Sequence, residues 1–337
     1  MMNEVHSASQ GVARAGLASA VVDGKIYLLG GHNGESPVKT LEVFEPGESI
    51  TSRGQWKEMP PMLARRTYLS AAVLGNRVFA IGGSADGRTL NTIEVFDPEE
   101  GAWAYWFTMP PMQTKRTLHA SAVGTGRLYV VGGFDGARDL PTVECYDHST
   151  NAWQWKSHLS IGRSYLAMAF AKGHIYAIGG QDRRLETGPR AHVTVEAFDL
   201  YSERWIPMAE LETGRLGHSA SVLIDEEGGE YIYACGGSDG SDVLSSVEVY
   251  SVNEGIWRAA PPMNIARLGH AAAVVNNMLY IMGGYDGKDP LDTFEVFDPK
   301  VNMWGPLLQM GVAKGDDVTE ASAAAAASAA AAASAGS

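Results

Sequence analysis

Six pairs of adjacent glycines, each three residues after an aromatic, divide the chain at intervals of 47 to 57 residues. The pairs begin at Gly30, Gly82, Gly132, Gly179, Gly236 and Gly283. Around each pair the same residues recur in a fixed order: an aromatic three positions before it, then a Glu and an aromatic two positions apart, then a Trp. An Arg opens each unit, ten residues after the preceding Trp in every unit but the first. A period of about 50 residues is typical of repeat folds such as propellers, in which each unit buries its core against the next.

The repeated positions can be read directly from the sequence. The aromatic before the glycines is Tyr27, Phe79, Tyr129, Tyr176, Tyr233 or Tyr280. The Glu and its aromatic are Glu42 and Phe44, Glu94 and Phe96, Glu144 and Tyr146, Glu196 and Phe198, Glu248 and Tyr250, Glu295 and Phe297. The Trp is Trp56, Trp106, Trp153, Trp205, Trp257 or Trp304. The Arg is Arg14, Arg66, Arg116, Arg163, Arg215 or Arg267.

Each unit predicts four strands, which we name a to d. In the third unit the small residues 120–123 predict strand a, the apolar segment 128–133 strand b, the alternating segment 142–147 strand c, and the Trp segment strand d. Turn dipeptides such as Asp135-Gly136 follow the glycine pairs and are typical of chain reversals. Helical periodicity is absent from the repeats. The sequence predicts an all-β fold, a six-bladed propeller with four antiparallel strands per blade.

Composition limits the function of the chain. A net charge of −13 argues against a nucleic-acid partner, because such proteins carry a basic face. Two cysteines, Cys145 and Cys235, are too few for a disulfide framework or a metal cluster and indicate a reducing compartment, cytoplasmic or also nuclear. The first residues lack a signal-peptide pattern, and no apolar stretch outside the alanine-rich tail is long enough for a membrane span. We expect neither a nucleic-acid nor a membrane partner.

The repeated Glu is expected to be structural. It shares a face of strand c with the aromatic two positions later. Because a buried carboxylate needs partners, we expect it to be half-buried and hydrogen-bonded, with no catalytic role.

The repeat resembles the kelch repeat in its glycine pair, its spaced aromatic, its Val-Glu-aromatic segment and its Trp-x-x-x-Pro-Pro-Met motif. Segments such as Val-Gly-Gly-Phe-Asp-Gly (131–136) and Arg-Leu-Gly-His (215–218 and 267–270) are similar to the kelch-like adaptor proteins. The resemblance covers about residues 14 to 310. It implies a docking platform for a protein or peptide, bound on the face that carries the d–a and b–c loops. Family members are often fused to BTB and BACK domains that recruit a cullin-RING ubiquitin ligase, and no segment here resembles either domain. A ligase receptor that works with a BTB-containing partner chain or isoform is therefore an alternative function.

The resemblance places two residues of each repeat on the rim of the binding face. They are the six arginines that open the units (Arg14, Arg66, Arg116, Arg163, Arg215, Arg267) and the residues after the glycine pairs (His32, Ser84, Phe134, Gln181, Ser238, Tyr285). An arginine ring suits carboxylates and phosphates, so the predicted ligand is an acidic or phosphorylated peptide segment. The alternative is that the arginines tie adjacent blades through hydrogen bonds. The residues after the glycines are better candidates for specificity, since the repeat does not require them to differ.

Blade 4 departs from the repeat on the same face. Glu196 lies sixteen positions after Gly180, where the corresponding distance in the other blades is eleven positions. The longer loop carries Arg183 and Arg184, which we predict to contact the partner, because long loops often carry recognition. A neutral insertion is the alternative.

An enzyme built on the same ring is the other function class. His119, His218 and His270 occupy one position, three after the Arg, and histidine is the commonest metal ligand. However, Arg-x-x-His is an ordinary variant of the repeat, and no phosphate-binding loop, Ser/His/Asp spacing or zinc motif is present. Cys145 and Cys235 take strand positions filled elsewhere by Val or Ala, which indicates core packing. We predict no catalytic residue, no metal and no cofactor.

The boundaries follow from the repeat. An N-terminal lead (1–13) precedes the propeller (14–310), with blades at about 14–62, 66–112, 116–159, 163–211, 215–263 and 267–310, and a low-complexity Ala/Ser tail (311–337) follows. Neither end offers a strong spare strand. Blade 6 is therefore expected to meet blade 1 through side-chain packing alone, or the chain is part of a longer product. The oligomeric state stays open, and a monomeric propeller is compatible with the sequence.

Overall fold

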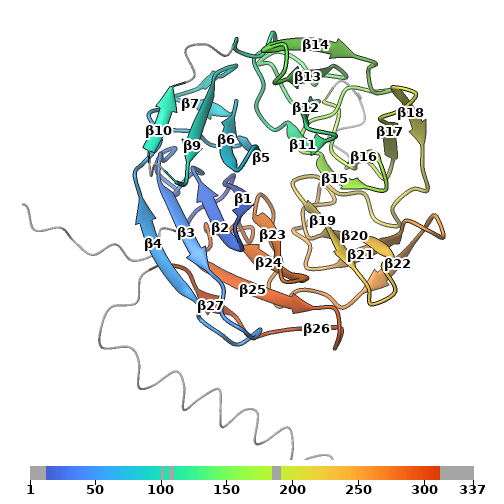
Figure 1. The fold of residues 1–337 in the computed structure, drawn as a ribbon. Helices are drawn as coiled ribbons and strands as arrows, with labels where there is room; N and C mark the ends of the chain where they lie inside the picture. Colours follow the sequence, from blue (N-terminus) through green and yellow to red (C-terminus); the bar gives the residue numbers. More distant parts are fainter. Residues whose placement is uncertain (1–12, 100–101, 106–109, 184–190, 312–337) are drawn as a thin grey trace, which may run out of the picture.

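The strands of this computed structural model form six antiparallel sheets arranged in a ring (Figure 1). The structure describes residues 13–99, 102–105, 110–183 and 191–311. Each sheet takes its strands a to d in order from the axis outward, so the predicted six-bladed all-β propeller is confirmed. Within the described residues there is no helix of the length and apolarity needed to cross a membrane.

The first three blades have regular four-stranded sheets. Blade 1 consists of β1 (Ala18–Val22), β2 (Lys25–Leu29), β3 (Leu41–Glu45) and β4 (Gln55–Met59). Blade 2 consists of β5 (Ser70–Leu74), β6 (Arg77–Ile81), β9 (Ile93–Asp97) and β10 (Ala102–Tyr105), with a small hairpin of β7 (Ser84–Ala85) and β8 (Arg88–Thr89) in its b–c loop. Blade 3 consists of β11 (Ala120–Gly124), β12 (Arg127–Val131), β13 (Val143–Asp147) and β14 (Ala152–Lys156).

The last three blades repeat this order. Blade 4 consists of β15 (Ala167–Ala171), β16 (His174–Ile178), β17 (Val195–Asp199) and β18 (Arg204–Pro207). Blade 5 consists of β19 (Ser219–Ile224), β20 (Glu230–Cys235), β21 (Val247–Ser251) and β22 (Ile256–Ala260). Blade 6 consists of β23 (Ala271–Val275), β24 (Met278–Met282) and β25 (Thr293–Asp298), whose outer edge pairs with both β26 (Met303–Trp304) and β27 (Leu308–Gln309).

Blade 2 corrects one assignment made from the sequence. Strands β9 and β10 pair so that Trp103 lies opposite Phe96, in the register that places Trp153 opposite Tyr146 in blade 3. Trp103 therefore takes the position predicted for Trp106, which lies outside the described residues. With Trp103, blade 2 has the same spacing of seven residues from the aromatic to the Trp as blade 3.

Aromatic side chains join neighbouring blades. The aromatic of strand b packs against the aromatic of strand c in the next blade, because the large rings fill the wedge between two sheets. The ring centroids lie 5.4 to 5.9 Å apart in the pairs Tyr27–Phe96, Tyr129–Phe198, Tyr176–Tyr250 and Tyr233–Phe297.

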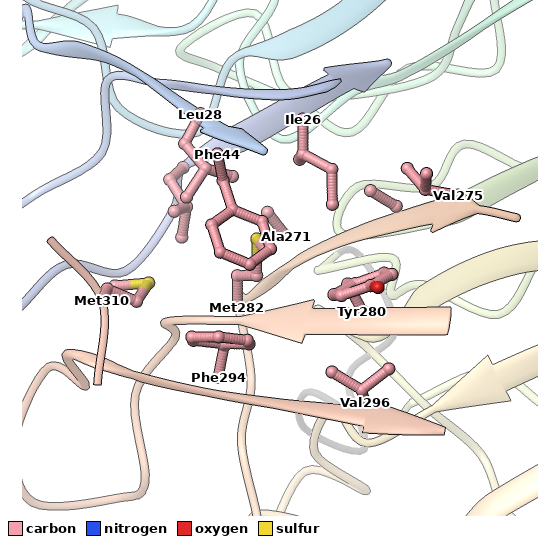
Figure 2. Packing of buried hydrophobic residues seen from close by; sticks show 12 residues of the cluster. Ile26, Leu28, Phe44, Ala271, Val275, Tyr280, Met282, Phe294, Val296 and Met310 are labelled. Atoms are coloured by element: carbon pink, nitrogen blue, oxygen red, sulfur yellow. The ribbon is translucent and has the colours of Figure 1, made fainter. Parts of the chain in front are cut away.

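Blade 6 meets blade 1 through the same kinds of contact as the other junctions. The ring of Tyr280 lies 6.0 Å from that of Phe44, and Figure 2 shows Phe44 pointing from blade 1 toward Phe294 and Met282 of blade 6. Backbone bonds also cross this junction: the amide of Gly284 donates to the carbonyl of Arg14 (2.9 Å), as Gly31 does to Arg66 (2.8 Å). The expectation that side-chain packing alone joins these blades is therefore wrong.

A collar of six side chains surrounds the axis, each three positions after the repeated Arg. Each collar residue faces the first residue of strand a in the preceding blade. A leucine faces an alanine in the pairs Leu17–Ala271, Leu69–Ala18 and Leu166–Ala120, each within one apolar cluster. A histidine is hydrogen-bonded to a serine in the pairs His119–Ser70 and His270–Ser219, at 2.9 Å between Nε2 and Oγ.

His218 breaks this matching of polarity. The position where its serine would stand holds Ala167, and neither ring nitrogen of His218 has a hydrogen-bond partner among the described residues. Burial lowers the pKa of His218 to about 3, so the imidazole is neutral at physiological pH. The pKa of His119 and of His270 is lowered to about 3 by the same cause.

Replacing Ala167 with Ser should stabilise the propeller. The new hydroxyl would give His218 the partner that Ser70 gives His119, and one buried hydrogen bond contributes about 0.5–1.5 kcal/mol. Urea denaturation measures the difference. Ala120→Ser is the matched control, since it sets a hydroxyl against Leu166 and should bring no gain. An equal effect of both substitutions would contradict the pairing rule.

The His218→Leu variant should make stability less dependent on pH. A histidine with a pKa of about 3 when folded and ~6.5 when unfolded binds more protons in the unfolded state, so its contribution is complete above pH ~6.5 and is lost as the pH falls toward 3. Removing one such group should lower the slope of unfolding free energy against pH by up to ~1.4 kcal/mol per unit between pH 6 and 4. Denaturation at several pH values checks this, and an unchanged slope would contradict a neutral His218.

Candidate binding face

The loops between strands b and c and between strands d and a share one face of the ring, which we call the top face. Six isolated bridges build its rim. In each blade the residue after the Arg pairs with the residue after the glycine pair: Ala15–His32, Thr67–Ser84, Thr117–Phe134, Ser164–Gln181, Leu216–Ser238 and Leu268–Tyr285.

The glycine pairs are required for this close approach. Gly132 has φ of +66°, and a Cβ at this position would lie 2.5 Å from the carbonyl oxygen of Arg163 in the next blade. Only glycine adopts this backbone conformation freely and leaves room for the neighbouring carbonyl. The repeated glycines therefore hold adjacent blades together at the top face.

The residues predicted to give specificity do gather on the top face. His32, Ser84, Phe134, Ser238 and Tyr285 are half-buried there. Gln181 shares the face, but it is buried, with 5 % of its surface exposed. The structure thus brings the six together, and their role in binding remains a prediction.

The six arginines do not lie on the surface of that face. Each has only 0–1 % of its surface exposed, although all six were predicted to line the rim. In blade 3, Arg116 donates to the carbonyl of Gly132 (2.7 Å), to both oxygens of Thr142 (2.8 and 3.0 Å) and to the carboxylate of Glu144 (2.9 Å). Its side chain therefore bonds within its own blade.

Glu144 connects this ion pair to the preceding d–a loop. Its carboxylate accepts from the backbone amides of Gln113 (2.6 Å) and Thr114 (3.1 Å). One guanidinium and one carboxylate thus fix the d–a loop, the end of strand b and the start of strand c. Burial lowers the pKa of Arg116, and the charge of Glu144 opposes this shift.

The same ion pair recurs in all six blades. The pairs are Arg14–Glu42, Arg66–Glu94, Arg116–Glu144, Arg163–Glu196, Arg215–Glu248 and Arg267–Glu295. The predicted exposure of these arginines is therefore wrong, because each charge is needed by a buried glutamate. The repeated glutamate is hydrogen-bonded, as expected, but it is buried where a half-buried side chain was expected. The alternative, that the arginines have a structural role, is the correct one. Their side chains bond within single blades, however, and do not tie adjacent blades together.

Arg183 of the blade 4 loop reaches the top face, as predicted. Its side chain is 38 % exposed, pairs with the buried Asp139 at 3.2 Å, and lies 4.4 Å from the ring centre of Phe134. Its backbone amide also donates to Asp139 (2.7 Å). Arg184 lies outside the described residues.

Sequence reasoning missed a ring of backbone hydrogen bonds around the axis, which we call the inner ring. It consists of the residues two positions after each Arg: Gly16, Tyr68, Leu118, Tyr165, Gly217 and Gly269. The amide of each donates to the carbonyl of its equivalent in the preceding blade, at 2.7 to 3.0 Å, and Gly16 closes the ring on Gly269. The Arg-x-Gly segments of blades 1, 5 and 6 were the available signal.

A recess opens on the top face where blade 6 meets blade 1. Its volume is about 420 Å³. Its walls include Ala15, His32, Tyr68, Leu268, Tyr285 and Pro290, with Lys288 and Asp289 at the same site. The Nδ1 atom of His32 accepts from the amide of Gly34 (3.1 Å), which leaves Nε2 as the protonated nitrogen of the neutral ring.

The described residues contain no group of three His, Cys, Asp or Glu side chains arranged to hold a metal ion. Both cysteines are free and buried, as expected for core positions. Burial raises the pKa of Cys235 to about 12, so this thiol is not a nucleophile at neutral pH.

Removing one buried arginine should destabilise the propeller strongly. The Arg116→Met variant leaves the carboxylate of Glu144 buried without a cation, which typically costs about 3–5 kcal/mol. Urea denaturation measures the loss. The matched control is Arg138→Met, because this side chain is 68 % exposed and its loss should cost less than ~0.5 kcal/mol. Equal losses in both variants would contradict a structural role for the buried pair.

Comparison with known structures supports the architecture. The solved structure entitled "Structure of YjhT" superposes with a TM-score of 0.73, covering 89 % of this chain and 99 % of that one, at 14 % sequence identity. This likeness shows the fold.

Curated relatives match short stretches of the chain. An F-box/kelch-repeat protein of Arabidopsis thaliana is 34 % identical over 82 residues, which cover 24 % of this chain and 20 % of that protein. Beta-scruin of Limulus polyphemus is 34 % identical over 116 residues (34 % and 12 %), and Kelch-like protein 15 of Homo sapiens is 24 % identical over 112 residues (33 % and 18 %). The matched stretches span a fifth or less of these relatives.

Models of known protein families match nearly the whole propeller. The KLHDC2/KLHL20/DRC7 Kelch-repeats domain matches residues 3–133 and 70–266, and the Kelch motif matches residues 266–305. Together with the six blades and their repeated glycine pairs, these matches show that the chain belongs to the kelch-repeat propeller family.

Proposed function

We propose that this protein is a non-catalytic interaction module that binds another protein on its top face. One observation carries the proposal: the repeated polar residues are buried, while the residues that differ between blades gather around one face. The six Arg–Glu pairs are internal, whereas five of the six residues after the glycine pairs are partly exposed. Repeat folds commonly bind partners on a surface of this kind, where loops vary on a constant scaffold.

The chemistry of the interior supports a non-catalytic role. The collar histidines are buried and neutral, and the pKa of Cys235 is raised to about 12, so none of these groups is prepared for acid–base or nucleophilic work near neutral pH. Metal analysis of the purified protein distinguishes a non-catalytic binding module from the alternative, a metal-dependent enzyme. Stoichiometric copper or zinc would contradict the proposal.

The preference for acidic or phosphorylated segments needs revision. It depended on a ring of exposed arginines, and those arginines are buried and paired. The six repeated arginines therefore give no reason to favour an anionic ligand.

A narrower function is that of a substrate receptor of a cullin-RING ubiquitin ligase, which the resemblance to the kelch-like adaptor proteins implies and which the similarity to Kelch-like protein 15 supports. It requires a BTB-containing partner chain or isoform. Co-purification of such a chain with the propeller, and loss of ubiquitin transfer to the captured partner in its absence, would support this function.

The Tyr285→Ala variant should weaken partner binding. Tyr285 lines the recess between blades 6 and 1, and an aromatic side chain in a partly buried recess is a frequent binding hot spot. Affinity capture with the tagged full chain should recover about a tenth or less of the partner when this side chain is removed. The control is Tyr201→Ala, which removes a side chain that is 98 % exposed in the turn between β17 and β18, on the opposite face. Partners captured equally by both variants would contradict binding on the top face.

A further inference from the structure

The inner ring requires an unusual backbone conformation in every blade. All six of its residues have positive φ, and glycine supplies this at Gly16 (64°), Gly217 (65°) and Gly269 (60°). Blades 2, 3 and 4 carry bulky residues at the same position: Tyr68 (52°), Leu118 (58°) and Tyr165 (56°). Bulky side chains are strained in this conformation. Three blades therefore keep a strained residue where three others show that glycine suffices.

The strained residues are not needed for the core of their blades. The collar residues that follow them, Leu69, His119 and Leu166, are the buried ones, whereas the three strained side chains are half-buried. They line the mouth of the central channel, a cavity of about 100 Å³, and Tyr68 also lines the larger recess between blades 6 and 1. The strained positions therefore present three large side chains on the top face.

The two tyrosines meet across the axis. Their ring centroids lie 5.8 Å apart in an edge-to-face arrangement. A Cβ at Gly16 would lie 2.8 Å from the ring of Tyr68, so the glycine of blade 1 makes room for this ring. The result is an asymmetric centre, with large side chains from blades 2 to 4 and glycines from blades 5, 6 and 1.

Among the described residues, the charge that lies next to these rings is balanced. The guanidinium of Arg183 lies 6.0 Å from the ring centre of Tyr165, and Asp139 neutralises it at 3.2 Å. Burial raises the pKa of Tyr165, so its phenol is uncharged at physiological pH. The ring of Tyr165 and the side chain of Leu118 are therefore complementary to apolar groups.

We propose that Tyr68, Leu118 and Tyr165 are the specificity-determining residues of the top face, and that they bind an uncharged, apolar segment of a partner protein. This inference rests on the proposed function. The chain tolerates strain at these positions because glycine would leave the partner nothing to contact.

The strain itself is tested first, by denaturation of the full-length protein. Glycine relieves the strain of a positive φ and alanine does not. The denaturation midpoint of Tyr68→Gly should therefore lie above that of Tyr68→Ala, and the same order is expected for Tyr165→Gly and Tyr165→Ala. Thr125 has φ of 48° in the exposed turn between β11 and β12, on the opposite face, and Thr125→Gly is the matched strain-relieving control. Alanine variants that are more stable than the glycine variants would overturn the strain argument.

Binding is tested with a random peptide library of about twelve residues displayed against the wild-type chain. Selected peptides should bind Tyr68→Gly and Tyr165→Gly about tenfold or more weakly by fluorescence anisotropy, and Thr125→Gly within about twofold of wild type. Their affinity should change little between about 50 and 500 mM NaCl, since no charge pairing is involved.

The outcomes separate this inference from the proposed function. Peptides that bind the wild type but ignore both tyrosine substitutions would overturn the inference and leave the binding function standing. Selection of acidic peptides whose affinity falls steeply with salt would contradict the inference that the bound segment is uncharged. A library without a single saturable binder would count against the binding function, and the inference would fall with it.

Discussion

The buried Arg–Glu pair is the interaction on which the rest of the propeller depends. A charge without a partner in a protein interior is very costly, so each blade that buries one Arg must also bury one Glu. The pair joins the d–a loop, the end of strand b and the start of strand c, as Arg116 and Glu144 show. The buried ion pair therefore holds the loops of the top face in position. Their exposed residues can vary without disturbing the blade.

This arrangement separates what repeats from what varies. Glycine pairs, cross-blade aromatic contacts and ion pairs are nearly identical in each blade and lie inside. The residues after the glycine pairs, the blade 4 loop and half of the inner ring differ, and they share one face. A constant interior with one variable face allows new recognition to evolve without a new fold. The collar also follows a repeated rule, because the two side chains that meet at each junction match in polarity except at His218 and Ala167.

The sequence predicts the fold well because periodicity reports burial and strand order directly. The six blades and the buried cysteines follow from it. The arginines were misplaced because periodicity cannot say whether a repeated cation faces solvent or a buried anion. A signal was present: each unit contains one repeated Arg and one repeated Glu, and only their pairing satisfies both. The Trp106 assignment failed for another reason, since a nearby Trp103 fits the strand register better. The inner ring was missed because it is made by backbone groups, and three of its members are not glycine.

The hydrogen bonds of the inner ring all run in one direction. Every blade donates to the one before it, and blade 1 donates to blade 6 through Gly16 and Gly269. A head-to-tail circle has no first and no last member. A circularly permuted chain, opened at a different d–a loop and joined between the present ends, would keep all six bonds. The order of the blades in space is thus a cyclic property, and blade 1 is first only in the numbering of the chain.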